Sequence, residues 1–392
     1  MEKKIFCLNK ISPVGLKVLT SDYVVSEDIN DADAVMVRSA QMHEMVLPER
    51  VLCVARAGAG VNNIPLLDYA KKGIVVFNTP GANANAVKEL VIASMLLASR
   101  DIVGGISWVK ENHDDENIAK SVEKAKSAFA GTEILGKTLG IIGLGAVGAL
   151  VAQAAGNLGM HVVAIEPSSA TIERNKHLLP NDIEFVTNYD DLYKVSDFIS
   201  LHVPLLDSTR SMINKDAINK MKDGVVIINI ARDAIVNDND IKEALLNKKV
   251  RKYVMDFPNF ATANMEGVIA IPHLGASTEE AEDNCAMMAS KEIMDFIENG
   301  NIINSVNYPR LDLGKRIHKR MIVLHEVKEG LPDQIVDVIR STNKEIFKME
   351  TGVKGDFGAT LIEFDQLPDA PHLCPFETIS SLDGVISVRV IK

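Results

Sequence analysis

Short apolar runs alternate with longer amphipathic stretches along the first three quarters of the chain. The runs have the length of buried strands, and the stretches have the spacing of helices that cover a sheet. This alternation predicts parallel sheets with helices packed against them. The expected strands span residues 4–8, 34–37, 51–55, 74–77, 138–142, 161–165, 197–201, 225–230, 252–255 and 268–271, and the clearest helices span 65–71, 85–99, 149–158 and 281–299.

The pattern changes near residue 320, after a linker at 307–319 that contains Pro309, Gly314 and several basic side chains. From there the order is strand, helix, strand, strand, helix, strand. This order is typical of a ferredoxin-like α+β module. The six elements are expected at 321–325, 332–341, 345–351, 359–364, 376–382 and 385–391.

Composition narrows the class of protein. The formal net charge of −11 argues against a nucleic-acid surface. The apolar runs are too short to cross a bilayer, and no cleavable signal pattern follows Met1, so we expect a cytoplasmic protein without a membrane partner. Cys7, Cys53, Cys285 and Cys374 are scattered and are expected to be free thiols, and we expect no metal site.

The strongest chemical signal is the turn between the expected strand 138–142 and the helix after it. Gly143, Gly145 and Gly148 have the spacing of a dinucleotide-binding turn. Such glycines permit a tight turn, a close approach of the backbone to a pyrophosphate, and close packing of helix on strand. Glu166 ends the next strand, where a carboxylate can accept hydrogen bonds from ribose hydroxyls and repel a 2′-phosphate. The alternative is a tight connection without a ligand, but the whole pattern favours NAD as the cofactor.

Three polar residues follow later strands of the same expected sheet. Arg232, Asp256 and His273 each stand at a carboxyl end, where ligands of open α/β sheets bind. Oxidation of a secondary alcohol needs a base, and histidine titrates in the right range. Arginine can hold a substrate carboxylate bidentately. Taken singly, His273 could be a cap or core residue and Arg232 a surface ion pair.

Several motifs, in this order, resemble the D-isomer-specific 2-hydroxyacid dehydrogenases over residues 38–308. Besides the glycine turn, they are Arg-Ala-Gly-Ala-Gly-Val-Asn-Asn at 56–63, Asn-Thr-Pro at 78–80, Phe-Ala-Gly-Thr-Glu-Ile-Leu-Gly-Lys-Thr-Leu-Gly at 129–140, His-Val-Pro-Leu at 202–205, Asn-Ile-Ala-Arg at 229–232 and Pro-His-Leu-Gly-Ala-Ser-Thr at 272–278.

The resemblance implies a role for each matching position. Arg232 would bind the substrate, His273 would be the acid/base, and Asp256 would hold the nicotinamide carboxamide. The NAD site would further include Thr79, Gly143, Gly145, Ala146, Val147, Gly148, Glu166, Val203, Ile230, Ala231, Leu274, Gly275 and Ala276, and the substrate site Arg56, Gly58, Gly60 and Lys126. Trp108 falls in the segment through which family members dimerise, so a homodimer or homotetramer is expected.

Length and resemblance together predict three domains. Two Rossmann-like or flavodoxin-like parallel-sheet domains would be followed by a ferredoxin-like, ACT-type regulatory domain. We place the discontinuous substrate-binding domain at 1–98 and 287–312, the NAD-binding domain at 99–286 and the ACT-type domain at 319–392.

The chain departs from the family pattern beside its catalytic residues. Family members pair the histidine with a glutamate, and ungapped counting puts Ala261 at that position. A carboxylate beside an imidazole fixes its tautomer and favours its protonated form. Glu266 could substitute if the loop folds back. Asp233 replaces the glycine that usually follows the arginine, and it would carry strain if that position required a positive φ.

The expected effector turn at His325 and Glu326 departs as well. Gly330 suits the turn, but Val327 and Glu329 replace the asparagine and proline that are usual there. Feedback inhibition by serine is therefore doubtful, and a domain that only mediates assembly is an equal alternative.

The leading functional hypothesis is hydride transfer from C2 of 3-phosphoglycerate to NAD, giving 3-phosphohydroxypyruvate, the first step of phosphorylated serine synthesis. One alternative is a reductase of hydroxypyruvate, glyoxylate or another 2-keto acid. Another is an NAD-sensing regulator without turnover, which the missing glutamate would favour and the retained Arg232 and His273 would not.

Overall fold

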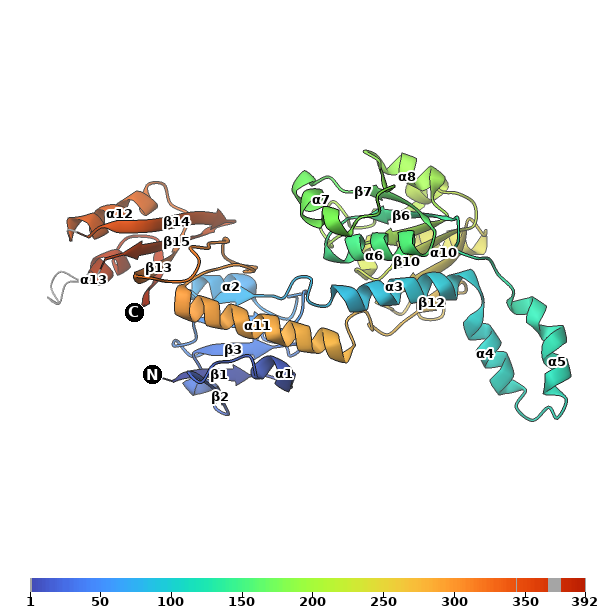
Figure 1. Cartoon of the computed structure of the whole chain (residues 1–392), viewed down its shortest axis with the longest axis horizontal. Coiled ribbons are helices and arrows are strands. Elements are labelled where there is room, and N and C mark those ends of the chain that lie inside the picture. The colour runs from blue at the N-terminus through green and yellow to red at the C-terminus, as the bar shows by residue number, and fades with distance from the viewer. Residues whose placement is uncertain (1, 343, 366–374, 392) are drawn as a thin grey trace. The chain divides into compact units, whose positions relative to one another are not determined.

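The computed structural model describes residues 2–342, 344–365 and 375–391 (Figure 1). The chain forms two compact units. One comprises residues 1–83 and 279–392, and the other comprises residues 84–278.

The N-terminal part of the first unit is a five-stranded parallel sheet in the order β2-β1-β3-β4-β5. The long helix α11 (Glu279–Asn299) packs against β4 and against α1 (Pro13–Leu16), because one of its faces is apolar over most of its length. The strands are β1 (Lys3–Cys7), β2 (Tyr23–Ser26), β3 (Ala34–Val37), β4 (Cys53–Arg56) and β5 (Val75–Phe77), and α2 (Leu66–Lys71) precedes β5.

The second unit is built on a seven-stranded parallel sheet in the order β12-β11-β10-β9-β6-β7-β8. Its central strands are mostly buried, as expected for a sheet covered on both faces, whereas the edge strands β8 and β12 are exposed or half-buried. They are β6 (Thr138–Ile142), β7 (His161–Ile165), β8 (Glu184–Phe185), β9 (Phe198–Leu201), β10 (Val225–Asn229), β11 (Val250–Met255) and β12 (Val268–Ala270). The helices are α3 (Ala84–Ser99), α4 (Ile102–Glu111), α5 (Ile118–Ala125), α6 (Ala146–Asn157), α7 (Ser169–Asn175), α8 (Tyr189–Val195), α9 (Lys215–Asn219) and α10 (Asp238–Leu246).

The two units divide the chain differently from the predicted domains. Helix α3, expected in the substrate-binding domain, packs on α6 and β10 of the second unit and contributes Val91 and Met95 to its core. The start of α11, expected in the NAD-binding domain, belongs to the first unit. Hydrophobic periodicity indicates that a helix has a buried face, but it does not indicate which sheet covers that face.

The C-terminal module, residues 319–391, has the predicted βαββαβ order and an antiparallel sheet in the order β14-β15-β13-β16. This arrangement confirms the ferredoxin-like prediction. Its elements are β13 (Lys319–Glu326), α12 (Leu331–Ser341), β14 (Ile346–Lys354), β15 (Phe357–Phe364), α13 (Pro375–Ser380) and β16 (Val385–Ile391).

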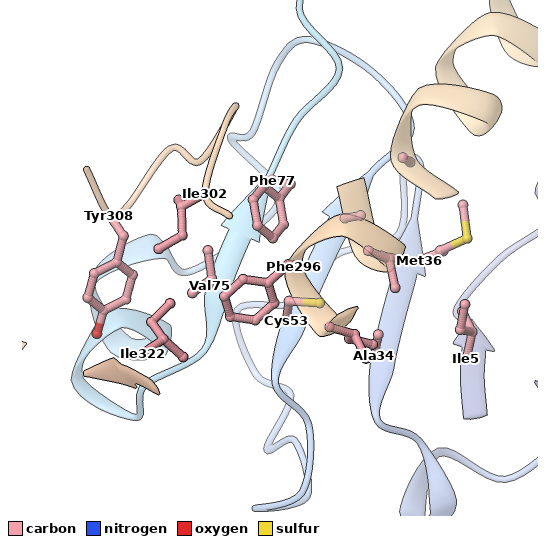
Figure 2. Close-up of a cluster of buried hydrophobic side chains, with 14 of the residues drawn as sticks. Ile5, Ala34, Met36, Cys53, Val75, Phe77, Phe296, Ile302, Tyr308 and Ile322 are labelled. Carbon is pink, nitrogen blue, oxygen red and sulfur yellow. The ribbon is translucent and has the colours of Figure 1, made fainter. Parts of the chain in front are cut away.

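The C-terminal module shares one hydrophobic core with the five-stranded sheet of its unit. Ile322 of β13 belongs to the same buried cluster as Phe296 of α11 and Tyr308 of the linker, and Figure 2 shows these side chains together. Leu361 of β15 adds to the cluster. One face of the module's sheet is therefore buried against α11 and its surroundings rather than left to solvent.

Two buried arginines tie the module to the end of α11. Arg320 is fully buried, pairs with the Glu363 carboxylate at 2.6 Å, and donates hydrogen bonds to the carbonyls of Asn299 and Gly314. Arg389 donates to the carbonyls of residues 296 and 297, which are unpaired groups of the last helical turn. Burial lowers the pKa of Arg389 to about 10. Both arginines cap α11 from the module.

Two sequence expectations about thiols and membranes can be compared with the described residues. Cys7, Cys53 and Cys285 are free thiols, as predicted, whereas Cys374 lies outside the described residues. Within the described ranges no single helix is long and apolar enough to cross a membrane, and only α3 and α4 pass such a test together, as a pair bent by 68°.

Candidate active site

The glycine turn lies where the strand order of the seven-stranded sheet reverses. Strand β6 has β7 on one side and β9 on the other. Ligands of open α/β sheets bind at such a point, outside the carboxyl ends of the strands. The topology therefore places the turn between β6 and α6 in the position expected of a dinucleotide site.

Each glycine of the turn meets a different spatial demand. Gly143 has a φ of 93°, and a Cβ there would lie 2.7 Å from the His202 carbonyl oxygen. A Cβ at Gly148 would overlap the Gly143 carbonyl oxygen, so α6 packs directly on the turn. Gly145 is the N-cap of α6 and has open space where a side chain would be. The turn thus leaves room for a pyrophosphate beside the N–H groups of a helix N-terminus.

Glu166 follows β7, and its carboxylate is held against the glycine turn. Oε2 accepts a hydrogen bond from the Leu144 N–H at 3.0 Å, and Oε1 accepts one from the Ser168 N–H at 2.9 Å. A carboxylate offers about four acceptor positions. Glu166 therefore retains capacity for the ribose hydroxyls of NAD.

Asp256 lies directly after β11 and is almost completely buried. Its Oδ2 accepts a hydrogen bond from the Gly275 N–H at 2.9 Å, whereas its Oδ1 has no hydrogen-bond partner among the described residues. Burial raises the pKa of the Asp256 carboxyl, and the Gly275 N–H and the charges of His273 and Arg232 oppose that rise. An unpaired buried acceptor is costly, and the amide of a nicotinamide would satisfy it.

Arg232 is positioned by the side chain of Asn229, the last residue of β10. The Asn229 Oδ1 accepts hydrogen bonds from the N–H groups of Ala231 and Arg232, and its Nδ2 donates to the Arg232 carbonyl at 2.8 Å. Sequence reasoning quoted Asn229 within a motif but gave it no role. The structure identifies it as the residue that shapes the turn carrying Arg232.

His273 occupies a left-handed backbone conformation with a φ of 50°, which is uncommon for a residue other than glycine. Its N–H donates to the Asp256 carbonyl at 2.9 Å. The imidazole lies against the ring of Phe257, with ring centroids 4.3 Å apart. Arg232 lies over the same ring, with its Cζ 5.2 Å from the centroid. The structure thus brings Arg232, Asp256 and His273 together, as predicted, and adds Phe257 between two of them.

The other residues predicted for the cofactor site are divided between the two units. Most lie in the second unit, around the glycine turn and the carboxyl ends of the strands. Ala146 and Val147 begin α6, and Val203 lies beside Gly143. Ile230 and Ala231 follow β10, and Leu274 to Ala276 follow His273, with Gly275 against Ile230. Thr79 belongs to the first unit, where its N–H donates to the Gly58 carbonyl.

Glu266 is a predicted catalytic residue that the structure does not bring beside His273, and its role stays a prediction. It precedes β12 and lines a surface pocket with Lys248, Arg251 and Gly267, beside the start of β11. His273 follows the opposite, carboxyl end of β12. The intervening segment is an extended strand, which carries the two side chains apart and prevents the fold-back that the prediction required.

Asp233 shows no sign of the strain that a positive φ would impose. It begins a short 3-10 helix, Asp233–Ile235, and is absent from the described residues with positive φ. An aspartate therefore replaces the family's glycine at this position without conformational cost.

In the first unit, Arg38 directly follows β3, and Arg56 is the last residue of the neighbouring strand β4. The Arg56 Nε donates to the Arg38 carbonyl at 3.0 Å, and its guanidinium lies over Gly58, so close that a Cβ there would contact Nη1. Arg38 pairs with Glu282 at 2.7 Å. Arg38, which sequence reasoning did not select, adds a second cation to the predicted substrate loop.

The substrate loop at 56–60, which includes Gly58 and Gly60, is supported by hydrogen bonds from Asn78. The Asn78 Nδ2 donates to the Ala59 carbonyl, and the Asn78 N–H donates to the Asn304 carbonyl. The Asn304 side chain in turn donates to the buried carboxylate of Glu292 on α11 at 2.6 Å. A chain of hydrogen bonds therefore links the loop to α11.

Lys126 is not joined to the other predicted substrate residues. It lies at the end of α5, is exposed, and pairs with Glu123. In the described ranges no hydrogen bond or ion pair connects it to Arg232, His273 or Arg56. Its contribution to a substrate site, from this chain or a second copy, stays a prediction.

At the expected effector turn, His325 is buried rather than available to a ligand. Its Nδ1 lies 2.8 Å from the Glu326 carbonyl and its Nε2 lies 3.2 Å from the Thr360 hydroxyl. Burial lowers the pKa of His325. Gly330 has a φ of 74°, so glycine suits the turn as predicted, whereas Val327 is half exposed.

Comparison with known proteins agrees with this geometry. Residues 92–275 match the NAD-binding domain of the D-isomer specific 2-hydroxyacid dehydrogenases. The chain is 37% identical to a hydroxypyruvate reductase of Thermotoga maritima over 67% of this chain and 86% of that protein. It is 31% identical to a D-3-phosphoglycerate dehydrogenase of Methanocaldococcus jannaschii over 86% of this chain, but it spans only 63% of that protein's length.

A solved structure shows the same similarity to this family of dehydrogenases. The NAD⁺-bound 3-phosphoglycerate dehydrogenase of Entamoeba histolytica superposes with a TM-score of 0.61 at 28% identity, covering 79% of this chain and all of that one. The chain belongs to the D-isomer specific 2-hydroxyacid dehydrogenases. It is an NAD-dependent oxidoreductase, similar over most of its length to several D-3-phosphoglycerate dehydrogenases.

Proposed function

We propose that this enzyme oxidises 3-phosphoglycerate at C2, giving 3-phosphohydroxypyruvate, and so begins phosphorylated serine synthesis. The observation that carries the proposal is that two arginines lie at the substrate loop, Arg56 and Arg38, of which Arg38 also pairs with Glu282. A 2-hydroxy acid without phosphate presents one anionic group, for which one arginine suffices. A phosphorylated substrate presents two, and guanidinium groups suit phosphate well.

The chain's own residues account for the chemistry other than hydride acceptance, which NAD supplies when bound. Arg232 holds the substrate carboxylate and polarises the C2 oxygen. His273 accepts the hydroxyl proton during oxidation and returns it during reduction. Asp256 would hold the carboxamide through its unpaired Oδ1, and Glu166 would hold the ribose.

The competing candidate is a hydroxypyruvate reductase, favoured by the 37% identity to the Thermotoga maritima enzyme. Rates of NADH-dependent reduction separate the two. Phosphohydroxypyruvate should be the better substrate if Arg38 and Arg56 bind phosphate. Equal rates with hydroxypyruvate would favour the competing candidate.

We further propose that α4 and α5 bind a second copy of the chain. Neither helix buries a side chain within the described residues. On α4, Ile102, Val103, Ile106 and Val109 are all exposed, and contiguous apolar surface of this kind marks an interaction site. Trp108 on the same helix contacts only Phe129 among the described aromatic rings.

Replacing Ile106 by aspartate should weaken self-association on the order of 10- to 100-fold, because a charge would enter an apolar interface. Sedimentation velocity across a concentration series measures the change. Val46→Asp is the matched control, since Val46 is a strongly exposed valine of the other unit. An unchanged distribution in Ile106→Asp, or an equal change in the control, would exclude α4 as the interface.

A further inference from the structure

The imidazole of His273 lacks the carboxylate partner that its family uses. Within the described ranges no aspartate or glutamate forms an ion pair with His273, and Glu266 lies beyond the far end of β12. The Asp256 carboxylate is engaged through Oδ2 with the Gly275 N–H and, within the described part of the chain, forms no hydrogen bond with the imidazole. A catalytic imidazole without a partner can rotate, and misplacement of a reacting group lowers turnover.

The group that does contact the imidazole is the ring of Phe257. The two ring centroids lie 4.3 Å apart with an interplanar angle of 43°. Aromatic pairs at such distances are attractive, and a protonated imidazole gains more because the face of the ring is negative. Arg232 lies over the same ring at 5.2 Å. One side chain therefore contacts both residues to which the chemistry is assigned.

Phe257 is itself held in place by the loop that follows it. The Asn259 Oδ1 accepts hydrogen bonds from the N–H groups of Ala261 and Thr262, and the backbone N–H of Asn259 donates to the Thr262 hydroxyl. The Asn259 Nδ2 donates to Asp238 at the start of α10, and Thr262 is buried. This compact loop follows directly on Phe257 and thereby fixes the backbone that presents its ring to the His273 imidazole.

We propose that Phe257 is a positioning residue that takes the place of the absent glutamate. Its ring limits rotation of the His273 imidazole and so holds it in the orientation from which it exchanges a proton with the substrate oxygen. The proposal rests on His273 being the proton carrier. A merely structural role is the alternative, because Phe257 also packs against the edge of the buried cluster beneath β10 and β11.

Leucine, tyrosine and tryptophan at position 257 distinguish the two roles. Phe257→Leu keeps apolar packing but removes the aromatic face, and we expect kcat for keto-acid reduction to fall about three- to ten-fold with little change in KM. Phe257→Tyr and Phe257→Trp should restore kcat. Phe260→Leu is the matched control, because Phe260 lies in the same loop and is fully exposed.

Each outcome bears on the proposal. An unchanged kcat in Phe257→Leu, or an equal fall in kcat and rise in KM, would overturn it, as would a loss that neither Phe257→Tyr nor Phe257→Trp restores. Melting temperatures of the three variants show whether each is folded, and Phe257→Met, which also lacks the aromatic face, provides the test if Phe257→Leu is not. A His273→Asn variant measured alongside keeps the two questions apart. Loss of activity there with a normal Phe257→Leu refutes only the role of Phe257, whereas retained activity in His273→Asn refutes the proton carrier itself.

Discussion

Replacing His273 by asparagine should lower kcat by ~10²–10⁴-fold, because asparagine cannot carry a proton at the C2 oxygen. Asparagine is the suitable substitution here. It tolerates the left-handed region better than most residues, so the φ of 50° at this position can be kept. The backbone hydrogen bond from residue 273 to the Asp256 carbonyl can then persist, and with it the turn that presents Gly275 to the Asp256 carboxylate.

Steady-state reduction of a 2-keto acid by NADH measures this effect. NADH affinity, followed by fluorescence titration, should change little, since the glycine turn and Glu166 are untouched. His161→Asn, at an exposed histidine that begins β7, is the control. Turnover near that of the wild type in His273→Asn would show that another group carries the proton.

Glu292→Gln should stabilise the protein at alkaline pH and have little effect near pH 4. Glu292 is buried on α11, and burial raises the pKa of its carboxyl from the ordinary 4.5 to about 8. Its Oε1 accepts from Asn304, whereas its Oε2 has no partner among the described residues. Glutamine keeps the shape and the acceptor, and it removes the proton equilibrium.

The direction of this pH dependence follows from the number of protons that the folded and unfolded states bind. Between pH 4.5 and 8 the unfolded chain releases the Glu292 proton while the folded chain keeps it, so the free energy of unfolding falls as pH rises. The fall is about 1.4 kcal/mol for each pH unit in that window. Below the window both states are protonated and the penalty is absent. The advantage of Glu292→Gln should therefore grow from pH 4.5 to 8 and then level off.

Urea unfolding of the two proteins at pH 5 and pH 8 measures the difference. Glu280→Gln removes an exposed carboxylate from the same helix and is the matched control. If the free energies of unfolding of wild type and Glu292→Gln differ by the same amount at both pH values, the raised pKa of this carboxyl is contradicted. Because Asn304 and Asn78 connect Glu292 to the substrate loop, the same variant also reports whether that connection affects KM.

The parts of the site that sequence could predict are those governed by local geometry. Gly143, Gly145 and Gly148 follow from the demands of a strand–turn–helix connection, and the structure meets each of them. Arg232, Asp256 and His273 were placed together because the carboxyl ends of parallel strands share one edge of a sheet. The βαββαβ order of the C-terminal module followed from its pattern of apolar runs.

The parts that sequence could not predict depend on tertiary contacts. The position of Glu266 depended on whether residues 256–273 fold back or extend, and neither composition nor spacing decides that. Phe257 carried no sequence signal, since an aromatic residue after a strand is usually part of the core. The attachment of the C-terminal module through Arg320 and Arg389 depends on carbonyls of α11 that are far away in the sequence.

The most direct test of the central claim is kcat/KM for NADH-dependent reduction of phosphohydroxypyruvate, hydroxypyruvate and glyoxylate by the same preparation. A charge-assisted hydrogen bond is worth ~1.5–3 kcal/mol, so phosphate binding by Arg38 or Arg56 should favour phosphohydroxypyruvate by about 10- to 100-fold. Equal or higher kcat/KM for hydroxypyruvate or glyoxylate would contradict the assignment of a phosphorylated substrate.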